Sequence, residues 1–289
     1  NGYESMAGQI NVEYKKPRTS EKAYFNGFIS DAGRQEANAN ASLLLNEHLS
    51  TMILAHGELQ NSNNDHNHDG FRDEPDIRQY NLFNRWDYMT ENFTVRAGFK
   101  ALGEERIGGQ FSYNPSDDDT WNNGFGININ TRRYEGFTKV GGVFGKEGSM
   151  TAGWIQNIAY HDQKSDFGTR SYDGIQKTYY SNLLYQWNPG LSRHNIDAGF
   201  SYKYDLYDEK LGALILGRKE SVPGVFAQYT YTDSAKMTFI AGIRTDFHNL
   251  YGTLVTPRVH LRYVINPVLT LRASAGKGYR SGNILAENS

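Results

Sequence analysis

Hydrophobic and polar residues alternate one by one over long stretches of this chain. Between Arg193 and Tyr207, the even-numbered positions are mainly apolar or aromatic, and the odd-numbered positions are mainly polar or charged. The same period of two recurs at 93–101, 237–244 and 269–276, with Ile240 as an apolar exception on the polar side. Because successive side chains of a strand point to opposite faces, this pattern predicts β-strands with one apolar and one charged face.

The predicted connections alternate in length. Short turns fit at 46–49, 89–92, 145–148, 188–192, 232–235 and 265–268, and longer polar segments lie near 61–76, 114–123, 161–173, 208–218 and 246–252. Counted from a strand near 21–31, the chain holds roughly thirteen strands, at about 20 residues for each strand and its connection. Short turns on one side and long loops on the other are typical of outer-membrane β-barrels, whose short turns face the periplasm.

Alternation alone also fits a soluble β-sandwich, which buries its apolar face. Strand length and aromatic placement favour a transmembrane barrel, with lipid outside and water inside. Several Trp and Tyr residues stand near predicted strand ends on the apolar face, where an aromatic girdle would lie: Trp86, Tyr88, Trp154, Tyr160, Tyr179, Tyr185 and Trp187. The sequence therefore predicts an all-β protein, an antiparallel transmembrane β-barrel.

Composition excludes several other classes of protein. The mean hydropathy of −0.66 and the lack of long apolar runs exclude a helical membrane protein, which needs about 20 consecutive apolar residues per span. A net charge of −2 argues against a nucleic-acid partner, and the absence of Cys fits an oxidising compartment. We find no nucleophile elbow, zinc-protease motif or phosphate-binding loop, so we predict that the protein is not an enzyme.

Two stretches carry a family resemblance. The first is "NGYESMAGQINVEYKKP" at the start of the chain, and the second is "TPRVHLRYVINPVLTLRASAGKGYRSGNILAEN" near its end. The first resembles the last part of the plug domain, and the second a mid-barrel stretch, of TonB-dependent outer-membrane receptors, in a subgroup common in the Bacteroidetes. The matching residues of the first stretch are Tyr3, Glu4, Ser5, Ala7, Gly8, Ile10, Asn11, Val12, Lys15 and Lys16.

The resemblance implies a barrel of about 22 strands, closed by an N-terminal plug, in the bacterial outer membrane. We then expect residues 1–17 to be the end of the plug and residues 18–289 to be the first part of the barrel. The implied function is active import of a scarce nutrient, captured at the extracellular loops and admitted by movement of the plug. The family's substrates are metal complexes such as ferric siderophores, haem, cobalamin and other chelates. Its partners are the TonB energy-coupling protein and outer-membrane lipid.

Cations on the polar side of the strands are expected to line the lumen. We expect them to pair with carboxylates of the plug more often than with substrate. These residues are Arg96, Lys100, Lys203, Arg244, Arg258 and Arg272.

The first long loop predicts a possible calcium site. Six residues occupy positions 1, 3, 5, 6, 9 and 12 of an EF-hand-type loop, and Phe71 would offer its backbone carbonyl. Position 12 is Asp instead of the usual Glu, and no helices flank the loop, so a solvated acidic loop remains an alternative. His66 and His68 also permit a transition-metal reading. The six residues are Asp65, Asn67, Asp69, Gly70, Asp73 and Asp76.

Two other functions share parts of the pattern. A passive, porin-like β-barrel channel would show the same alternation and loop asymmetry, but it would not need the plug-like opening. A soluble all-β binding protein would show the period of two, but it would not place Tyr and Trp outward near strand ends.

Overall fold

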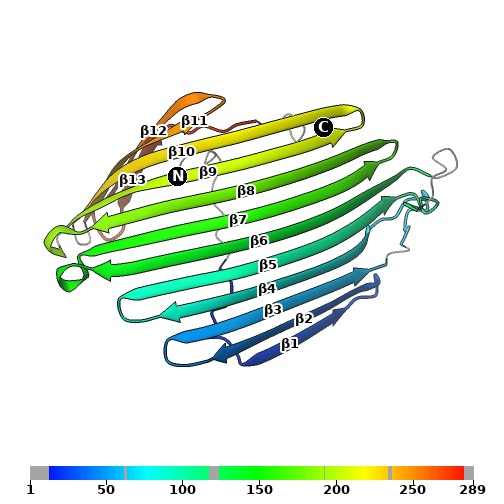
Figure 1. The fold of residues 1–289 in the computed structure, drawn as a ribbon, viewed down its shortest axis with the longest axis horizontal. Coiled ribbons are helices and arrows are strands. Elements are labelled where there is room, and N and C mark those ends of the chain that lie inside the picture. The colour runs from blue at the N-terminus through cyan, green and yellow to red at the C-terminus, as the bar shows by residue number, and fades with distance from the viewer. Residues whose placement is uncertain (1–12, 62–63, 117–123, 192, 234–235, 283–289) are drawn as a thin grey trace.

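The computed structural model describes residues 13–61, 64–116, 124–191, 193–233 and 236–282. In this part of the chain, 13 strands form one antiparallel sheet in sequence order, each paired with the next (Figure 1). The strands are β1 (Ala23–Ile29), β2 (Arg34–Leu44), β3 (Leu49–Gln60), β4 (Asp76–Met89), β5 (Phe93–Gly109), β6 (Gly126–Phe144), β7 (Met150–Phe167), β8 (Arg170–Trp187), β9 (His194–Leu211), β10 (Leu214–Asp233), β11 (Met237–His248), β12 (Gly252–Val264) and β13 (Thr270–Gly276). Two single-turn 3₁₀ helices, η1 (Lys146–Gly148) and η2 (Pro189–Leu191), lie in the short turns.

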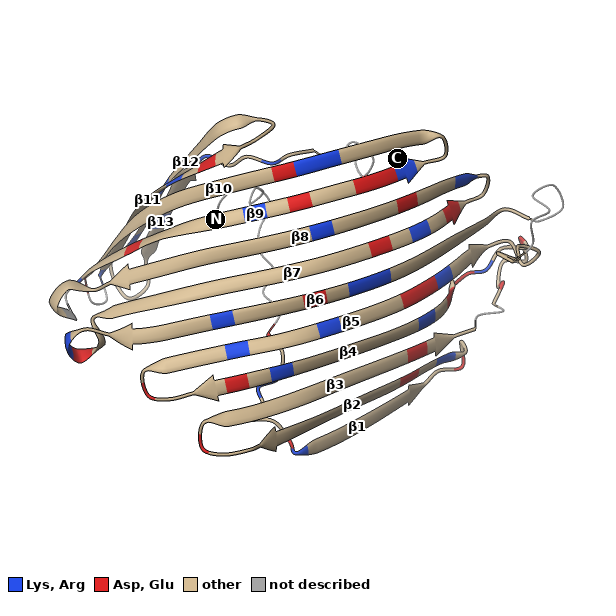
Figure 2. Cartoon of the chain, in the orientation of Figure 1, with Lys and Arg blue, Asp and Glu red and all other residues tan. Residues whose placement is uncertain are grey.

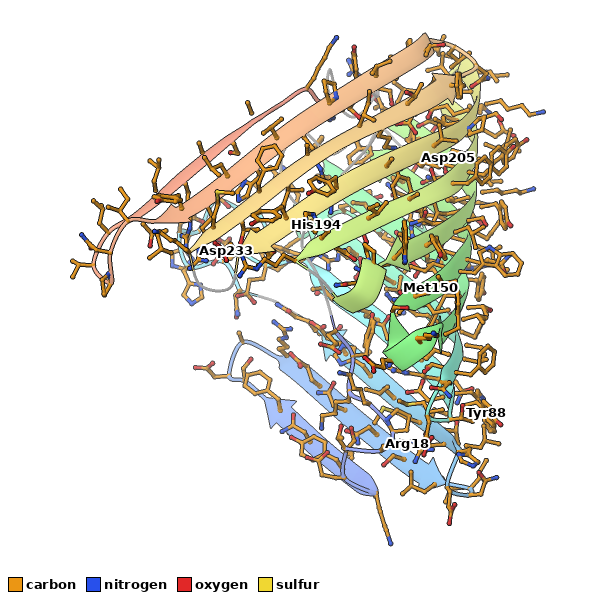
Figure 3. The ribbon with its side chains drawn as sticks, turned by 90° about the vertical axis from the view of Figure 1, so that its left-hand side faces the viewer. Arg18, Tyr88, Met150, His194, Asp205 and Asp233 are labelled. Atoms are coloured by element: carbon orange, nitrogen blue, oxygen red, sulfur yellow. The ribbon has the colours of Figure 1, made fainter. Side chains whose placement is uncertain are left out.

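The sheet bends into an open trough. In Figure 3, β1 to β3 at one end of the sheet and β11 to β13 at the other turn toward the same side. Strands β1 and β13 each pair on one side only among the described residues. The arrangement is therefore a partly closed barrel wall, and the predicted all-β, antiparallel fold with about thirteen strands is confirmed.

One face of the sheet is apolar and exposed. The strand registers place Phe200 of β9 beside Leu183 of β8 and Val225 of β10, and these side chains are 46%, 50% and 48% exposed. Phe93 and Leu271 are also exposed, so these rows do not pack together in a closed core. The soluble sandwich is thereby excluded. All seven aromatic residues assigned to the girdle share this outer face, because each pairs with a neighbour of the same row.

The opposite face is mainly polar, and the buried side chains of the sheet lie on it. Among the described residues, the buried hydrophobic side chains are few, Met52, Ile77, Phe83 and Val222, whereas the buried polar group is larger and includes Arg85, Asp205, Glu220 and Asp246. This is the reverse of a soluble protein, where the hydrophobic side chains are the ones found inside. The inner face therefore depends on hydrogen bonds and ion pairs instead of apolar packing.

The connections match the predicted short turns but not all the predicted loops. At one end of the strands, β2–β3, β4–β5 and β6–β7 join through short turns; at the other end, the β3–β4 and β5–β6 connections are long (Figure 1). The predicted loops at 161–173, 208–218 and 246–252 are wrong. There the strands continue and turn tightly, β7 into β8 at 168–169 and β9 into β10 at 212–213. The hydrogen bonds between paired strands do not depend on which side chains flank them, so these segments stay in the sheet.

No helix among the described residues is long and apolar enough to cross a membrane.

Of the predicted plug tail, residues 1–12 lie outside the described residues. Residues 13–22 precede β1 and lie against the inner face, where the Tyr14 ring stacks on Phe83.

Candidate functional site

The six cations predicted to line a lumen lie on the inner face of the sheet. Arg96 and Lys100 come from β5, Lys203 from β9 and Arg244 from β11, and Arg258 and Arg272 come from β12 and β13. The registers place Lys203 beside Val222, whose neighbours Gly224 and Phe226 share the inner row with Arg244. Arg258 lies opposite Gly242 and Gly276. The sequence period of two thus brings residues from five strands to one surface.

This surface is hollow where β7 to β13 curve. A cavity of about 1430 Å³ opens there, and its lining includes Lys203, Arg244, Arg258, Asp197 and Asp246. A second hollow, of about 1030 Å³, lies over β1 to β6, and most of its lining residues, such as Gly57, Tyr80 and Gly103, belong to the outer face. The first cavity is therefore the one that belongs to the charged inner wall.

In the described part of the chain, seven inner cations are neutralised by an acid two residues away on their own strand. Arg85 Nε lies 2.7 Å from Asp87 Oδ1, and Lys203 Nζ lies 2.9 Å from Asp205 Oδ2. Residues i and i+2 share a face of a strand, so a sequence of the form Arg-x-Asp builds an ion pair within one strand. The same pairing holds for Arg34–Glu36, Arg106–Glu104, Arg133–Glu135, Arg218–Glu220 and Arg244–Asp246. Figure 2 shows these acidic and basic positions side by side along β4, β9 and β10.

The sequence carried a signal for this network that the alternation analysis missed. Each pair is readable as a basic and an acidic residue separated by one position, as in "RWD", "KYD" and "RTD". On a strand with one apolar face, both charges of such a triplet must lie on the polar side.

The pairs join across strands into a buried network. Arg244 Nη2 donates to Ser201 Oγ at 2.6 Å, and Gln176 Nε2 donates to Asp205 Oδ1 at 3.4 Å. Gln228 Nε2 donates to Asp197 Oδ2 at 3.0 Å, and Gln228 Oε1 accepts a hydrogen bond from Arg258 Nη2. A buried carboxylate is costly unless it is paired, so this network holds the inner wall in one arrangement.

Other inner cations have no acidic partner among the described residues. Arg96 lies directly opposite Lys139, and Arg262 directly opposite Arg272, with no ion pair to any described carboxylate. Like charges opposite each other on a sheet destabilise it. The buried Nε of Arg96 also makes no hydrogen bond within the described structure. These cations are the places where an anionic group facing the wall would be stabilised most.

The predicted calcium loop folds around its own backbone. Asp65 accepts hydrogen bonds from the backbone N–H groups of Asp69 and Gly70, at 3.0 and 2.9 Å, and Gly70 has the positive φ of 82° that the sharp turn requires. Asn67 donates to Asp69 at 2.9 Å. The first three predicted ligands, Asp65, Asn67 and Asp69, are therefore brought together.

The last two predicted carboxylate ligands, Asp73 and Asp76, face other partners. Asp73 Oδ2 accepts hydrogen bonds from the backbone N–H of His66 at 2.9 Å and from its Nδ1 at 2.7 Å. The backbone hydrogen bond, followed by the one from the imidazole, lowers the pKa of Asp73. Asp76 Oδ2 lies 3.5 Å from Arg72 Nε, and Phe71 bridges to Gln110 of the next connection. Among the residues that the structure describes, no group of three or more His, Asp or Glu side chains is placed to hold a metal ion.

Comparison with known proteins identifies the family. Residues 45–289 match the family model described as "TonB dependent receptor-like, beta-barrel". The chain belongs to this family. The TonB-dependent receptor barrel is a bacterial outer-membrane structure, which agrees with the exposed apolar face and the outward aromatic residues. No curated protein matches the sequence.

Solved structures of siderophore receptors share this fold. The siderophore receptor PirA from Pseudomonas aeruginosa aligns with a TM-score of 0.69 and 11% identity, covering 91% of this chain and 43% of that one. The ferric enterobactin receptor PfeA from the same organism gives 0.66 and 11%, with coverage of 90% and 44%. The alcaligin receptor FauA from Bordetella pertussis gives 0.66 and 13%, with coverage of 87% and 42%. The TonB-dependent receptor barrel described above thus spans less than half the length of these structures.

Proposed function

We propose that this chain is the first part of the barrel of a TonB-dependent importer that takes up a scarce metal complex. A ferric siderophore, haem, cobalamin or another metal chelate would be captured at the extracellular side and admitted when TonB acts on a plug domain. The main support is the two-sided wall: an apolar, aromatic face turned outward and a dense, ordered charge network turned inward, on a chain of this receptor family. The chemistry is binding and passage, with no covalent step.

The inner cations that lack an acidic partner among the described residues support a plug. Arg96 and Lys139, and Arg262 and Arg272, are like charges placed directly opposite each other, and in an open channel only water and salt would screen them. Carboxylates of a domain inside the barrel would offset them. A passive channel remains the competing function.

Uptake in cells with and without TonB separates the two functions. The complete receptor gene would be expressed in a strain that lacks it, and accumulation of labelled ferric siderophore, haem and cobalamin would be measured. We expect receptor-dependent uptake of at least one of these complexes, and we expect that uptake to stop when TonB is deleted. Uptake that continues without TonB would establish a passive channel. A receptor that binds none of the complexes would refute the substrate class while leaving the barrel assignment intact.

A further inference from the structure

Residues 14–18 lie against the inner wall, where the rings of Phe83 and Phe137 form a seat for Tyr14. The Tyr14 ring stacks on Phe83 of β4 with ring centroids 4.5 Å apart and planes at 15°. Phe83 in turn stacks on Phe137 of β6 at 6.1 Å and 10°. Phe83 is only 6% exposed, although most side chains on this face are polar. An apolar ring that faces water is unfavourable unless another side chain covers it. Here the Tyr14 ring covers Phe83.

Gly98 of β5 makes room for the seat. It lies between Arg85 and Phe137 on the inner face, and a Cβ at this position would come within 2.5 Å of the Phe137 ring and 2.8 Å of the Asn84 carbonyl oxygen. No side chain other than hydrogen fits there without moving the ring or the backbone. The absence of a side chain at Gly98 therefore lets Phe137 lie flat and extends the aromatic surface that reaches Tyr14.

Polar contacts attach the same segment to other parts of the wall. Lys15 Nζ lies 3.0 Å from Glu21 and 3.5 Å from Asn40 Oδ1 of β2, and it lies over the Tyr24 ring of β1 at 4.6 Å. Arg18 Nη2 donates to the Glu47 carbonyl oxygen in the β2–β3 turn at 2.7 Å. Figure 3 shows Arg18 close to the strands at this end of the sheet. The segment is thus fixed to β1, β2, β4 and the turn at 45–48.

The charge beside the stack is also matched. Glu13 pairs with Lys16 at 2.6 Å, and this hydrogen bond is the main reason why the pKa of Glu13 is lowered, with smaller contributions from the inner-wall cations Arg85 and Arg96. The carboxylate that precedes Tyr14 therefore lies within the field of Arg96, whose Nε has no hydrogen bond in the described structure.

We propose that residues 14–18 are a fixed anchor that stays docked on the Phe83–Phe137 seat throughout transport. The conformational change that admits substrate then takes place without release of this segment from the wall. The transport part of this inference rests on the proposed function; the docking part does not. The alternative is that residues 14–18 detach from the wall in each transport cycle.

Limited proteolysis of the complete receptor tests the docking. Trypsin cleaves after Lys15 and Arg18, so their protection reports how often the segment leaves the wall. Tyr14→Ala removes the stack, and we expect cleavage at these bonds to become about fivefold faster, the effect of losing one aromatic pair. Tyr14→Phe keeps the ring and should cleave like the wild type. Equal cleavage rates for Tyr14→Ala and wild type would refute the claim that the Tyr14 stack holds this segment on the wall.

Cross-linking tests whether the anchor stays in place. The described chain contains no native Cys, so Arg18→Cys with Glu47→Cys adds one defined pair and leaves the aromatic stack intact. A short, cleavable thiol cross-linker would join them in the complete receptor, and each single variant serves as a control. We expect unchanged uptake after cross-linking. Uptake that is lost on cross-linking and restored by cleaving the linker would overturn the anchor. No uptake before cross-linking would instead point to failure of the proposed function.

Discussion

At the scale of single residues, the acidic loop between β3 and β4 is the place where structure and sequence pattern agree only in part. Asp65, Asn67 and Asp69 converge around the turn at Gly70, as the calcium-loop spacing predicts. Asp73 and Asp76 bond instead to His66 and Arg72. Side-chain partners outside the twelve-residue pattern decide this difference, and spacing alone contains no information about them.

We propose that Ca²⁺ binds this loop through Asp65, Asn67 and Asp69, with Asp73 and Asp76 turning in as ligands. The affinity expected for an extracellular module is about 10⁻⁴–10⁻³ M. Calorimetric titration of the complete receptor should therefore show binding in the millimolar range that Asp65→Asn and Asp69→Asn both remove. Glu91→Gln, a carboxylate in the opposite short turn, is the matched control. Identical titrations for wild type and Asp65→Asn would leave the loop as a solvated acidic segment.

The pairing of His66 with Asp73 predicts how the loop responds to acid. The pKa of Asp73 is lowered from its ordinary value of 3.8, so the ionised carboxylate stabilises the folded loop above that value. This stabilisation is lost as the pH falls through the lowered pKa. The protection of the His66 amide against hydrogen exchange, relative to its intrinsic rate at each pH, should therefore persist on acidification to pH 4 and fall only below it. Asp73→Asn should lack this transition, and a transition that persists in the variant would refute the assignment.

At the scale of strands, the outer face is the feature whose energy is easiest to test. Phe200 lies near the middle of the apolar row of β9, and Asp208 lies on the same face of the same strand, beyond that row. A cation at the middle of the bilayer costs about 2–4 kcal/mol in a barrel, against about 0–1 near the interface. Phe200→Arg should lower the free energy of unfolding by the larger amount, and Asp208→Arg by the smaller.

The measurement is urea unfolding of the complete receptor folded in lipid vesicles. Equal costs for the two substitutions would mean that the apolar row does not face hydrocarbon. A larger cost at Asp208 would place the bilayer at the wrong height on the wall.

Strand existence and facing were predictable from sequence, but strand ends were not. The alternation at 193–207 predicts β9 because one face must be apolar, and the observed strand continues to Leu211. Asp208, Glu209 and Lys210 are polar on both faces, so the alternation of apolar and polar residues no longer marks the strand there. Backbone pairing with β8 and β10 continues regardless, because hydrogen bonds between strands do not depend on which side chains flank them.

The inner wall was predictable in composition but not in connectivity. The period of two places Arg244 and Asp246 on one face from sequence alone. The bond from Arg244 to Ser201 depends on the register between β9, β10 and β11, which turn geometry and pairing fix in three dimensions. The stacking of Tyr14 on Phe83 and Phe137 could not be predicted for the same reason. Phe83 lies on β4 and Phe137 on β6, and they meet only because Gly98 of the intervening strand β5 has no side chain.

At the scale of the whole molecule, the open edges of the sheet have a direct consequence. Strands β1 and β13 present unpaired backbone groups along one side within the described chain. Such edges pair with other copies unless they are covered. Residues 1–289 expressed alone should therefore form oligomers in detergent that grow with concentration in sedimentation experiments, whereas the complete receptor should sediment as one species. A monomeric 1–289 chain would show that the edges are covered some other way.

The ion pairs between residues two positions apart also determine how strongly the inner face would attract a charged substrate. Each such doublet is a small dipole whose field falls off quickly with distance, whereas a row of bare cations would hold a negatively charged cargo in a deep well. Under the proposed function, strands such as β4, β9 and β11 would therefore attract an anionic substrate weakly at many positions instead of strongly at one. Stronger binding of an anionic group would then be confined to positions where two cations lie opposite each other, such as Arg96 and Lys139.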